Sequence, residues 1–177
     1  MGYDPDRHHR RSIRLKGYDY AQAGAYFVTI CVHQRRSLLG QIINGSLQPS
    51  PAGVMVQQVW DEMPQHYAGV ELDAFTLMPN HIHGIIVLCP TEAIAQPLTL
   101  GDAVHRFKSF TTAQYRKGVY DQNWEPFAGR FWQRNYYEHI IRNEQSLNHI
   151  RHYIATNPQR WVDDTLNPSH PKSISPP

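Results

Sequence analysis

The chain has 177 residues, of which 41% are hydrophobic, 18% charged and 11% aromatic. This composition is typical of one folded domain and excludes a disordered chain, a collagen or a coiled coil. No apolar run is long enough to cross a bilayer, and no apolar segment of the kind found in secretory signals follows the charged N-terminus. Cys31 and Cys89 lie in apolar runs, so the sequence predicts a cytoplasmic protein with free thiols and no membrane contact.

The net charge of +2 conceals an uneven distribution of basic residues. Residues 37–104 contain no Lys or Arg and six acidic side chains, so the rest of the chain carries +8. Such segregation indicates a surface that faces a polyanion, although an unevenly charged solvated surface explains it nearly as well. The candidate DNA contacts are Arg10, Arg11, Arg14, Lys16, Arg106, Lys108 and Arg134.

Hydrophobic periodicity predicts an alternation of strands and helices along the chain. The expected elements are strands over 25–33 and 38–44, a helix over 50–67, strands over 70–78 and 81–88, a helix over 98–118, a strand over 130–141 and a helix over 143–157. This order predicts an α+β, ferredoxin-like antiparallel sheet with helices packed on one face and a C-terminal helix. The expected organisation is a basic arm over 1–20, a single domain over 21–162 and a Pro-rich flexible tail over 163–177.

The predicted strand over 130–141 combines aromatic and basic side chains. Aromatic rings interleaved with arginines can stack unpaired bases. Regular alternation assigns one face to Phe131, Gln133, Asn135 and Tyr137 and the other to Trp132, Arg134 and Tyr136. Only one of these faces can contact DNA, and the other belongs to the core.

His81 and His83 stand two apart in a predicted strand, so both imidazoles project from the same face of the sheet. Two neutral imidazoles placed in this way can bind one metal ion. Hydrogen-bonded structural histidines are the common alternative. No Cys-x-x-Cys or His-Glu-x-x-His pattern is present, so a structural zinc site and a zinc protease site are not favoured.

Tyr153 and Asn157 are four residues apart, so they are neighbours on one face of the last predicted helix. A helical tyrosine is usually a core or boundary residue, and a functional role therefore depends on the surrounding motifs. Those motifs are MPNHIHGIIVL and FWQRNYYEHIIRNEQSLNHIRHYIATNP, with RRSIRLKGYDYAQAGAYFVTICVH and GDAVHRFKS before and between them.

Together these stretches, from about residue 10 to residue 161, resemble the REP-associated tyrosine transposases. These proteins are a branch of the single-tyrosine HUH nucleases, which also include the single-strand insertion-sequence transposases. The resemblance implies that His81 and His83 bind the metal and that Tyr153 is the nucleophile. It places Asn157 where the insertion-sequence relatives carry Gln as a third ligand. It also implies that the basic arm helps to read a short guide tetranucleotide beside a DNA hairpin.

The function implied is cleavage and rejoining of single-stranded DNA hairpins through a 5′-phosphotyrosine intermediate. The implied cofactor is Mg²⁺ or Mn²⁺, and the protein would act as a monomer or a homodimer. One alternative is a domesticated, non-catalytic nucleic-acid-binding protein on the same fold. A second is a metal-dependent hydrolase that acts through water. The hydrolase needs a carboxylate near the metal, and none stands at a fixed spacing from His81 and His83.

Overall fold

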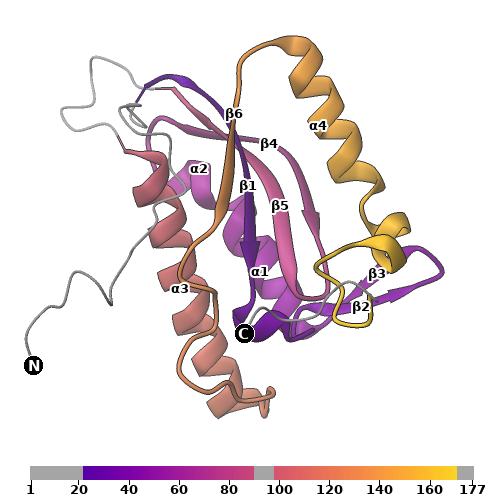
Figure 1. The fold of residues 1–177 in the computed structure, drawn as a ribbon. Helices are drawn as coiled ribbons and strands as arrows, with labels where there is room; N and C mark the ends of the chain where they lie inside the picture. Colours follow the sequence, from indigo (N-terminus) through magenta and orange to yellow (C-terminus); the bar gives the residue numbers. More distant parts are fainter. Residues whose placement is uncertain (1–21, 90–97, 171–177) are drawn as a thin grey trace, which may run out of the picture.

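A computed structural model describes residues 22–89 and 98–170 of the chain (Figure 1). The strands are β1 (Gly24–Cys31), β2 (Gly40–Ile43), β3 (Ser46–Pro49), β4 (Val70–Leu77), β5 (His81–Leu88) and β6 (Tyr137–Ile141). The helices are α1 (Pro51–Asp61), α2 (Met63–His66), α3 (Leu100–Gln122) and α4 (Glu144–Thr156), with short 3₁₀ turns at His33–Arg35 and Pro158–Asp163. None of the described helices is long and apolar enough to cross a membrane. Cys31 and Cys89 are free thiols.

The main sheet has the strand order β4-β5-β1-β6, and each neighbouring pair is antiparallel. The α+β fold with an antiparallel sheet is therefore confirmed. β5 lies between β4 and β1, which places the histidine strand inside the sheet and not at its edge. In the β1–β5 register, His83 is opposite Thr29 and His81 is opposite Cys31.

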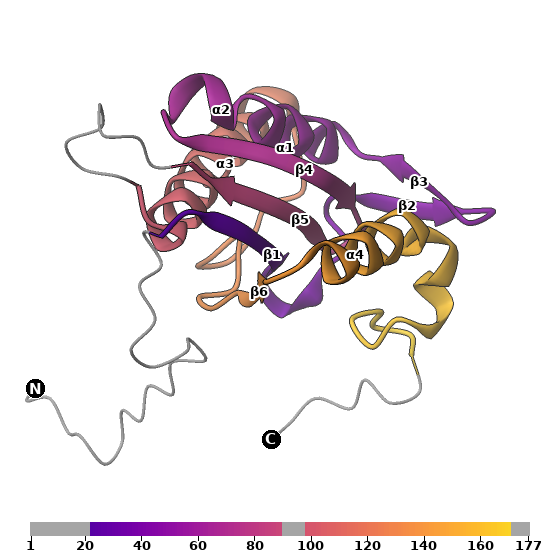
Figure 2. The same cartoon turned by 90° about the horizontal axis from the view of Figure 1, so that it is seen from above.

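The two faces of the sheet are covered by different helices, as Figure 2 shows. On one face, Tyr26, Val28 and Ile30 pack into a core that includes side chains of α1 and α3. On the other face, Phe27 and Ile85 pack against Ile154 of α4. Successive side chains of β1 therefore point in turn toward α1 and α3 on one face and toward α4 on the other. Among the described long helices, α4 alone covers this second face.

The starts of the helices follow their sequence signals. Ser50 Oγ accepts a hydrogen bond from Gly53 N at the start of α1, and Pro51 occupies the first turn. Asn143 Oδ1 accepts a hydrogen bond from Ser146 N at the start of α4. Both helices therefore begin with a side chain that caps the first turn.

The strand predicted over 130–141 is wrong in its first half, since β6 begins only at Tyr137. Phe131 and Trp132 are adjacent in sequence, yet both are buried in the same core, which regular alternation forbids. A single bridge joins Trp132 to Val32, and Trp132 Nε1 donates a hydrogen bond to Thr111 Oγ1. Contacts with α3 therefore position this segment in place of the strand pairing expected for it. The short strand β3 was also not predicted.

The first residues after the 3₁₀ turn at Pro158–Asp163 pack against the end of the sheet. Asn80 Nδ2 donates hydrogen bonds to the carbonyls of Leu166 and Arg35, and Arg35 Nη1 donates to the carbonyl of Thr165. Residues 164–167 therefore form an anchored strap, which we call the C-terminal strap, within the segment predicted as a flexible tail. The predicted basic arm and residues 171–177 lie outside the described residues.

Candidate metal and tyrosine site

The two histidines of β5 are almost completely buried on the face of the sheet covered by α4. Their side chains are 0% (His81) and 2% (His83) exposed, and their Nε2 atoms lie 3.0 Å apart. The strand period of two therefore brings both imidazoles to one point, as the sequence predicts.

Asn80 fixes the tautomer of His81. Because the Asn80 amide nitrogen already donates to two backbone carbonyls, its Oδ1 is the atom that faces His81 Nδ1, at 2.7 Å. His81 Nδ1 therefore carries a hydrogen, and its Nε2 presents a lone pair toward His83.

His83 is oriented by Thr29 on the neighbouring strand, whose Oγ1 lies 2.8 Å from His83 Nδ1. The ring of Phe27 stacks on the His83 imidazole with 5.4 Å between centroids. Burial lowers the pKa of His83 to about 3 and holds the pKa of His81 well below its usual value. Both rings are consequently neutral at physiological pH, the state in which imidazole binds metals.

The structure adds a third group that the sequence did not reveal. Asp164 Oδ2, from the C-terminal strap, lies 3.6 Å from His81 Nε2, and the ligand atoms of Asp164, His81 and His83 all fall within 4.8 Å of one another. This oxygen is buried without a hydrogen-bond partner among the described residues, and burial raises the pKa of the carboxyl group. No local sequence pattern identifies Asp164, because the strap reaches the histidines only through tertiary packing.

Asn157 stands at the C-terminal end of α4, and its side chain is 4% exposed. Its Oδ1 is also buried without a hydrogen-bond partner in the part of the chain described. Its side chain is close enough to Tyr153 to lower the pKa of the phenol. The predicted proximity of Tyr153 and Asn157 is therefore confirmed.

Tyr153 extends from α4 toward His83, with 3.4 Å between its hydroxyl oxygen and His83 Nε2. Phe27 meets the tyrosine ring edge-on at 6.0 Å between centroids. Burial raises the pKa of Tyr153, and the hydrogen bond with Asn157 acts in the opposite direction. The phenol is therefore protonated at neutral pH and needs help to become a nucleophile.

These side chains suit a divalent cation. Two neutral imidazole nitrogens face one another, and two buried oxygens, Asp164 Oδ2 and Asn157 Oδ1, have no hydrogen-bond partner among the described residues. Unpaired buried oxygens cost free energy unless a cation or a proton meets them. A set of imidazole, carboxylate and amide ligands fits Mn²⁺ or Mg²⁺ better than a thiolate-preferring metal.

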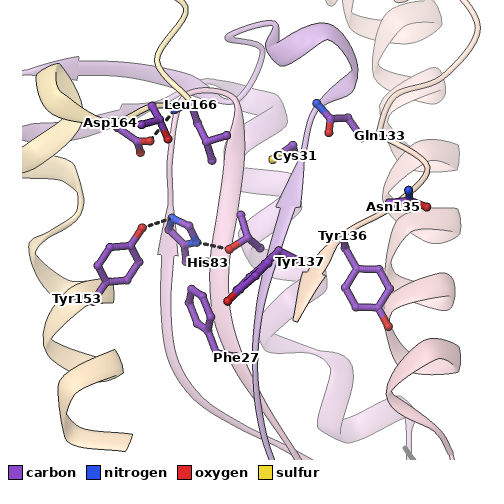
Figure 3. A pocket seen from close by; sticks show the side chains of 12 residues that line it. Phe27, Cys31, His83, Gln133, Asn135, Tyr136, Tyr137, Tyr153, Asp164 and Leu166 are labelled. Atoms are coloured by element: carbon purple, nitrogen blue, oxygen red, sulfur yellow. Dashed lines mark hydrogen bonds between the residues drawn. The ribbon is translucent and has the colours of Figure 1, made fainter. Parts of the chain in front are cut away.

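A cavity of about 560 Å³ opens beside Tyr153 and His83 (Figure 3). Its walls come from β1, from β5, from α4, from the C-terminal strap and from the segment before β6. The lining residues are Phe27, Thr29, Cys31, His83, Gln133, Asn135, Tyr136, Tyr137, Tyr153, Asp164, Thr165 and Leu166. The tyrosine and the candidate metal ligands therefore border a space large enough for part of a substrate.

Of the described basic residues predicted to bind DNA, Lys108 and Arg134 line one groove along α3, and Arg106 is not among the residues that line it. Lys108 Nζ donates to the backbone carbonyls of residues 133, 134 and 135 at 3.0–3.3 Å, and burial lowers its pKa to about 8. Lys108 thus has an internal role that the sequence did not predict. Arg134 borders a groove of about 510 Å³ along α3 together with Arg116 and Arg130, whereas the guanidinium of Arg106 lies over the ring of Tyr67. Arg10, Arg11, Arg14 and Lys16 lie outside the described residues.

Comparison with known proteins identifies relatives over most of the chain. Residues 22–157 match the model of the IS200-like transposase family. An uncharacterized protein of Haemophilus influenzae is 42% identical over 180 residues, covering 93% of this chain and 96% of the relative. A second Haemophilus influenzae protein, provisionally assigned as a REP-associated tyrosine transposase, is 25% identical and covers 79% of this chain and 73% of its own length.

The fold has a counterpart among solved structures. A REP-associated tyrosine transposase bound to a REP hairpin matches with a TM-score of 0.57 at 20% identity, over 82% of this chain and 73% of that protein. The family match covers more than half of the chain and includes β5 and α4. The chain therefore belongs to the IS200-like transposase family, a family of DNA-binding transposases, and the predicted resemblance to the REP-associated branch is confirmed.

Proposed function

We propose that this transposase cleaves and rejoins single-stranded DNA at hairpins, with Tyr153 as the nucleophile. The observation that carries the proposal is the approach of the Tyr153 hydroxyl to 3.4 Å from His83 Nε2, beside the three clustered candidate ligands His81, His83 and Asp164. A tyrosine that only packed in the core would not require its hydroxyl oxygen to lie beside a buried pair of histidines.

The reaction follows from the phenolic oxygen. Tyr153 Oη attacks the scissile phosphorus, a new P–O bond forms, and the bond from phosphorus to the 3′-oxygen breaks. The phenolic proton passes to solvent water, and the departing 3′-oxygen takes a proton from solvent to become a hydroxyl. The products are a 5′-phosphotyrosine and a free 3′-OH. Because the phosphodiester energy is kept, attack by another 3′-OH reverses the step and rejoins the strand without ATP.

His81, His83, Asp164 and Asn157 would hold the divalent cation, which supplies polarisation of the scissile phosphate and charge neutralisation. The chain's own groups prepare the nucleophile around it. The Asn157 hydrogen bond favours the charged form of the phenol, and Phe27 fixes the planes of both His83 and Tyr153. Asn80 and Thr29 hold the two imidazoles so that their Nε2 atoms converge.

The tyrosine, the two histidines and Asp164 come together within one chain. This arrangement supports action as a monomer. A homodimer, the other state that the resemblance implies, would serve to hold two DNA ends.

The groove along α3 is the described surface that best suits the DNA backbone. Arg116, Arg130 and Arg134 border it, and none of its described lining residues is acidic. The groove shares Gln133 with the cavity beside Tyr153, so a strand lying on the arginines would continue toward the tyrosine. The likeness to a transposase solved with a REP hairpin supports hairpin DNA as the partner. The basic arm would add further phosphate contacts.

The hydrolase alternative gains one feature from the structure, because Asp164 supplies the carboxylate that the sequence did not place near the histidines. Hydrolysis with Asp164 as the base for water and cleavage with Tyr153 as the nucleophile give different products. Only the tyrosine route leaves a covalent link between protein and DNA.

The test incubates the full chain with Mn²⁺ and REP-type hairpin oligonucleotides that carry single-stranded flanks on both sides. We expect a protein–DNA adduct on a denaturing gel, and its loss in Tyr153→Phe, with hairpin binding retained on a native gel. Tyr120→Phe is the matched control, since Tyr120 is 90% exposed on α3. Cleavage without an adduct would support the hydrolase, and binding without cleavage would support the non-catalytic binder.

A further inference from the structure

The cavity beside Tyr153 extends beyond what cleavage of a phosphodiester requires. Its far wall is the segment 133–137, which contributes Gln133, Asn135, Tyr136 and Tyr137. None of these residues belongs to the candidate metal group, and the proposed reaction assigns them no role. Figure 3 shows Tyr137 between the His83 side of the cavity and the Gln133 and Asn135 side.

This wall is held by hydrogen bonds to its backbone, although it has no regular secondary structure before Tyr137. The partly buried ammonium of Lys108 binds three successive carbonyls, those of Gln133, Arg134 and Asn135. Gln133 N also donates to the carbonyl of Cys31 at 2.8 Å. A segment tied at consecutive backbone positions presents its side chains in a fixed arrangement, which recognition of a ligand requires.

The side chains on this wall have the chemistry that recognises a nucleobase. The amides of Gln133 and Asn135 each offer a donor and an acceptor, and neither side chain is engaged in a hydrogen bond with another described residue. Tyr137 is 55% exposed, and it meets the edge of Phe27 at 6.3 Å between centroids. Exposed aromatic rings provide stacking surfaces for unpaired bases.

We propose that this cavity receives one unpaired base of the cleaved strand, next to the scissile phosphate, and that Gln133 and Asn135 read its identity. The proposal rests on the proposed function, because it assumes that the scissile phosphate lies at Tyr153. Gln133 and Asn135 are thus specificity-determining residues, and Lys108 is a positioning residue that acts through their backbone.

A base fits this cavity better than a phosphate does. No Lys or Arg is among the described residues that line it, and Asp164 contributes a carboxylate. The negative charge of a phosphate in this cavity would therefore be balanced only by the bound cation. The neighbouring groove carries three arginines. The volume of about 560 Å³ is within the usual range for small-ligand pockets and exceeds that of a single base. The strand would then place its phosphates on the arginines and one base among the amides.

The test uses a REP-type hairpin oligonucleotide whose single-stranded flanks are randomised, together with the full chain and Mn²⁺. The strands joined covalently to the protein, and the fragments released with a free 3′-OH, are sequenced to give the base preference at each position beside the cut. The variants are Gln133→Leu and Asn135→Leu. Gln48→Leu is the control, since Gln48 is an exposed glutamine on β3.

We expect one position adjacent to the cut to show a base preference in the parent protein and in Gln48→Leu. That preference should fall by roughly tenfold in Gln133→Leu or Asn135→Leu, as the loss of a good amide–base pair implies. The total adduct formed with the best-suited pool should fall less than the preference does. An unchanged preference in both variants, with adducts still forming, would overturn the base-reading role. Absence of adducts for the parent with every pool would instead overturn the proposed function.

Discussion

Asp164 Oδ2 lies 3.6 Å from His81 Nε2, although one residue follows the last helix and the other begins a central strand. The carboxylate changes the character of the site, because two imidazoles and an amide carry no charge to offset a divalent cation. Cation affinity in oxygen-containing sites rises with the number of charged ligands.

Asp164→Asn should therefore lower Mn²⁺ affinity by roughly tenfold or more. Asn157→Ala should cost less, since the oxygen that it removes is uncharged, and His83→Ala should abolish measurable binding. Isothermal titration with Mn²⁺ checks all three. Asp163→Asn is the control, because Asp163 is the exposed neighbour of Asp164. Equal affinities in the Asp163 and Asp164 variants would exclude the carboxylate from the site.

Asn80 has two separable tasks, which are to orient His81 and to hold the C-terminal strap. Asn80→Leu removes both, and we expect Mn²⁺ affinity to fall by about 10- to 100-fold, as for other groups that orient a ligand. Asn80→Asp keeps the acceptor oxygen for His81 but loses the donor to Leu166. If the aspartate variant binds Mn²⁺ as weakly as the leucine variant, anchoring of the strap matters more than the tautomer of His81.

Salt dependence should distinguish the two candidate DNA surfaces. On single strands, the logarithm of affinity changes with the logarithm of salt concentration by about −0.7 per phosphate contact. Arg130→Gln combined with Arg134→Gln should therefore flatten the slope by about 1.4, while Arg142→Gln, on an exposed residue just after β6, should leave it unchanged. Fluorescence anisotropy with a labelled hairpin measures the slope.

Removal of residues 1–16 tests the basic arm in the same assay. The arm carries five basic side chains, and if two to four of them meet phosphate the slope should flatten by roughly 1.5 to 3. Loss of preference for one hairpin should accompany this change if the arm reads guide bases. A truncated chain with the parental slope and the parental preference would leave the groove along α3 as the DNA surface.

The pH dependence of stability should report the burial of Lys108. Desolvation lowers its pKa in the folded protein to about 8, below the usual value for lysine, which the unfolded chain retains. At pH values between the two, the unfolded chain holds the extra proton, so raising the pH favours the folded state. The stability of the parent relative to Lys108→Met should therefore increase between pH 8 and pH 10 in urea denaturation. A constant difference over this interval would mean that the ammonium is solvated.

Gly84 tests the packing behind the histidines. It lies on β5 one residue after His83 and faces the other layer, where an added Cβ would collide with the buried ring of Trp60. Gly84→Ala should destabilise the protein by about 1–3 kcal/mol, as overpacking of a core does. Chemical denaturation provides the measurement. Gly129→Ala is a poor control despite its open surroundings, because the backbone of Gly129 has a positive φ of 72°.

Local pattern determined much of this protein. The period of two in β5 places His81 and His83 on one face, and the spacing of four in α4 places Tyr153 beside Asn157. Both relationships depend only on the geometry of a single element. The caps Ser50 and Asn143 are equally local, because each satisfies amides within its own first turn.

Tertiary structure alone decided which distant groups meet. Asp164 reaches His81 because Asn80 and Arg35 donate hydrogen bonds to backbone carbonyls of the strap. Every residue has such a carbonyl, so the sequence does not indicate which ones are bound. Lys108 resembles a surface cation in sequence, yet it is engaged by three carbonyls of an irregular segment. Trp132 leaves the expected alternation because its indole finds Thr111 on α3. Periodicity determines the direction in which a side chain leaves its own helix or strand. The residue that it contacts depends on how the helices and strands pack together.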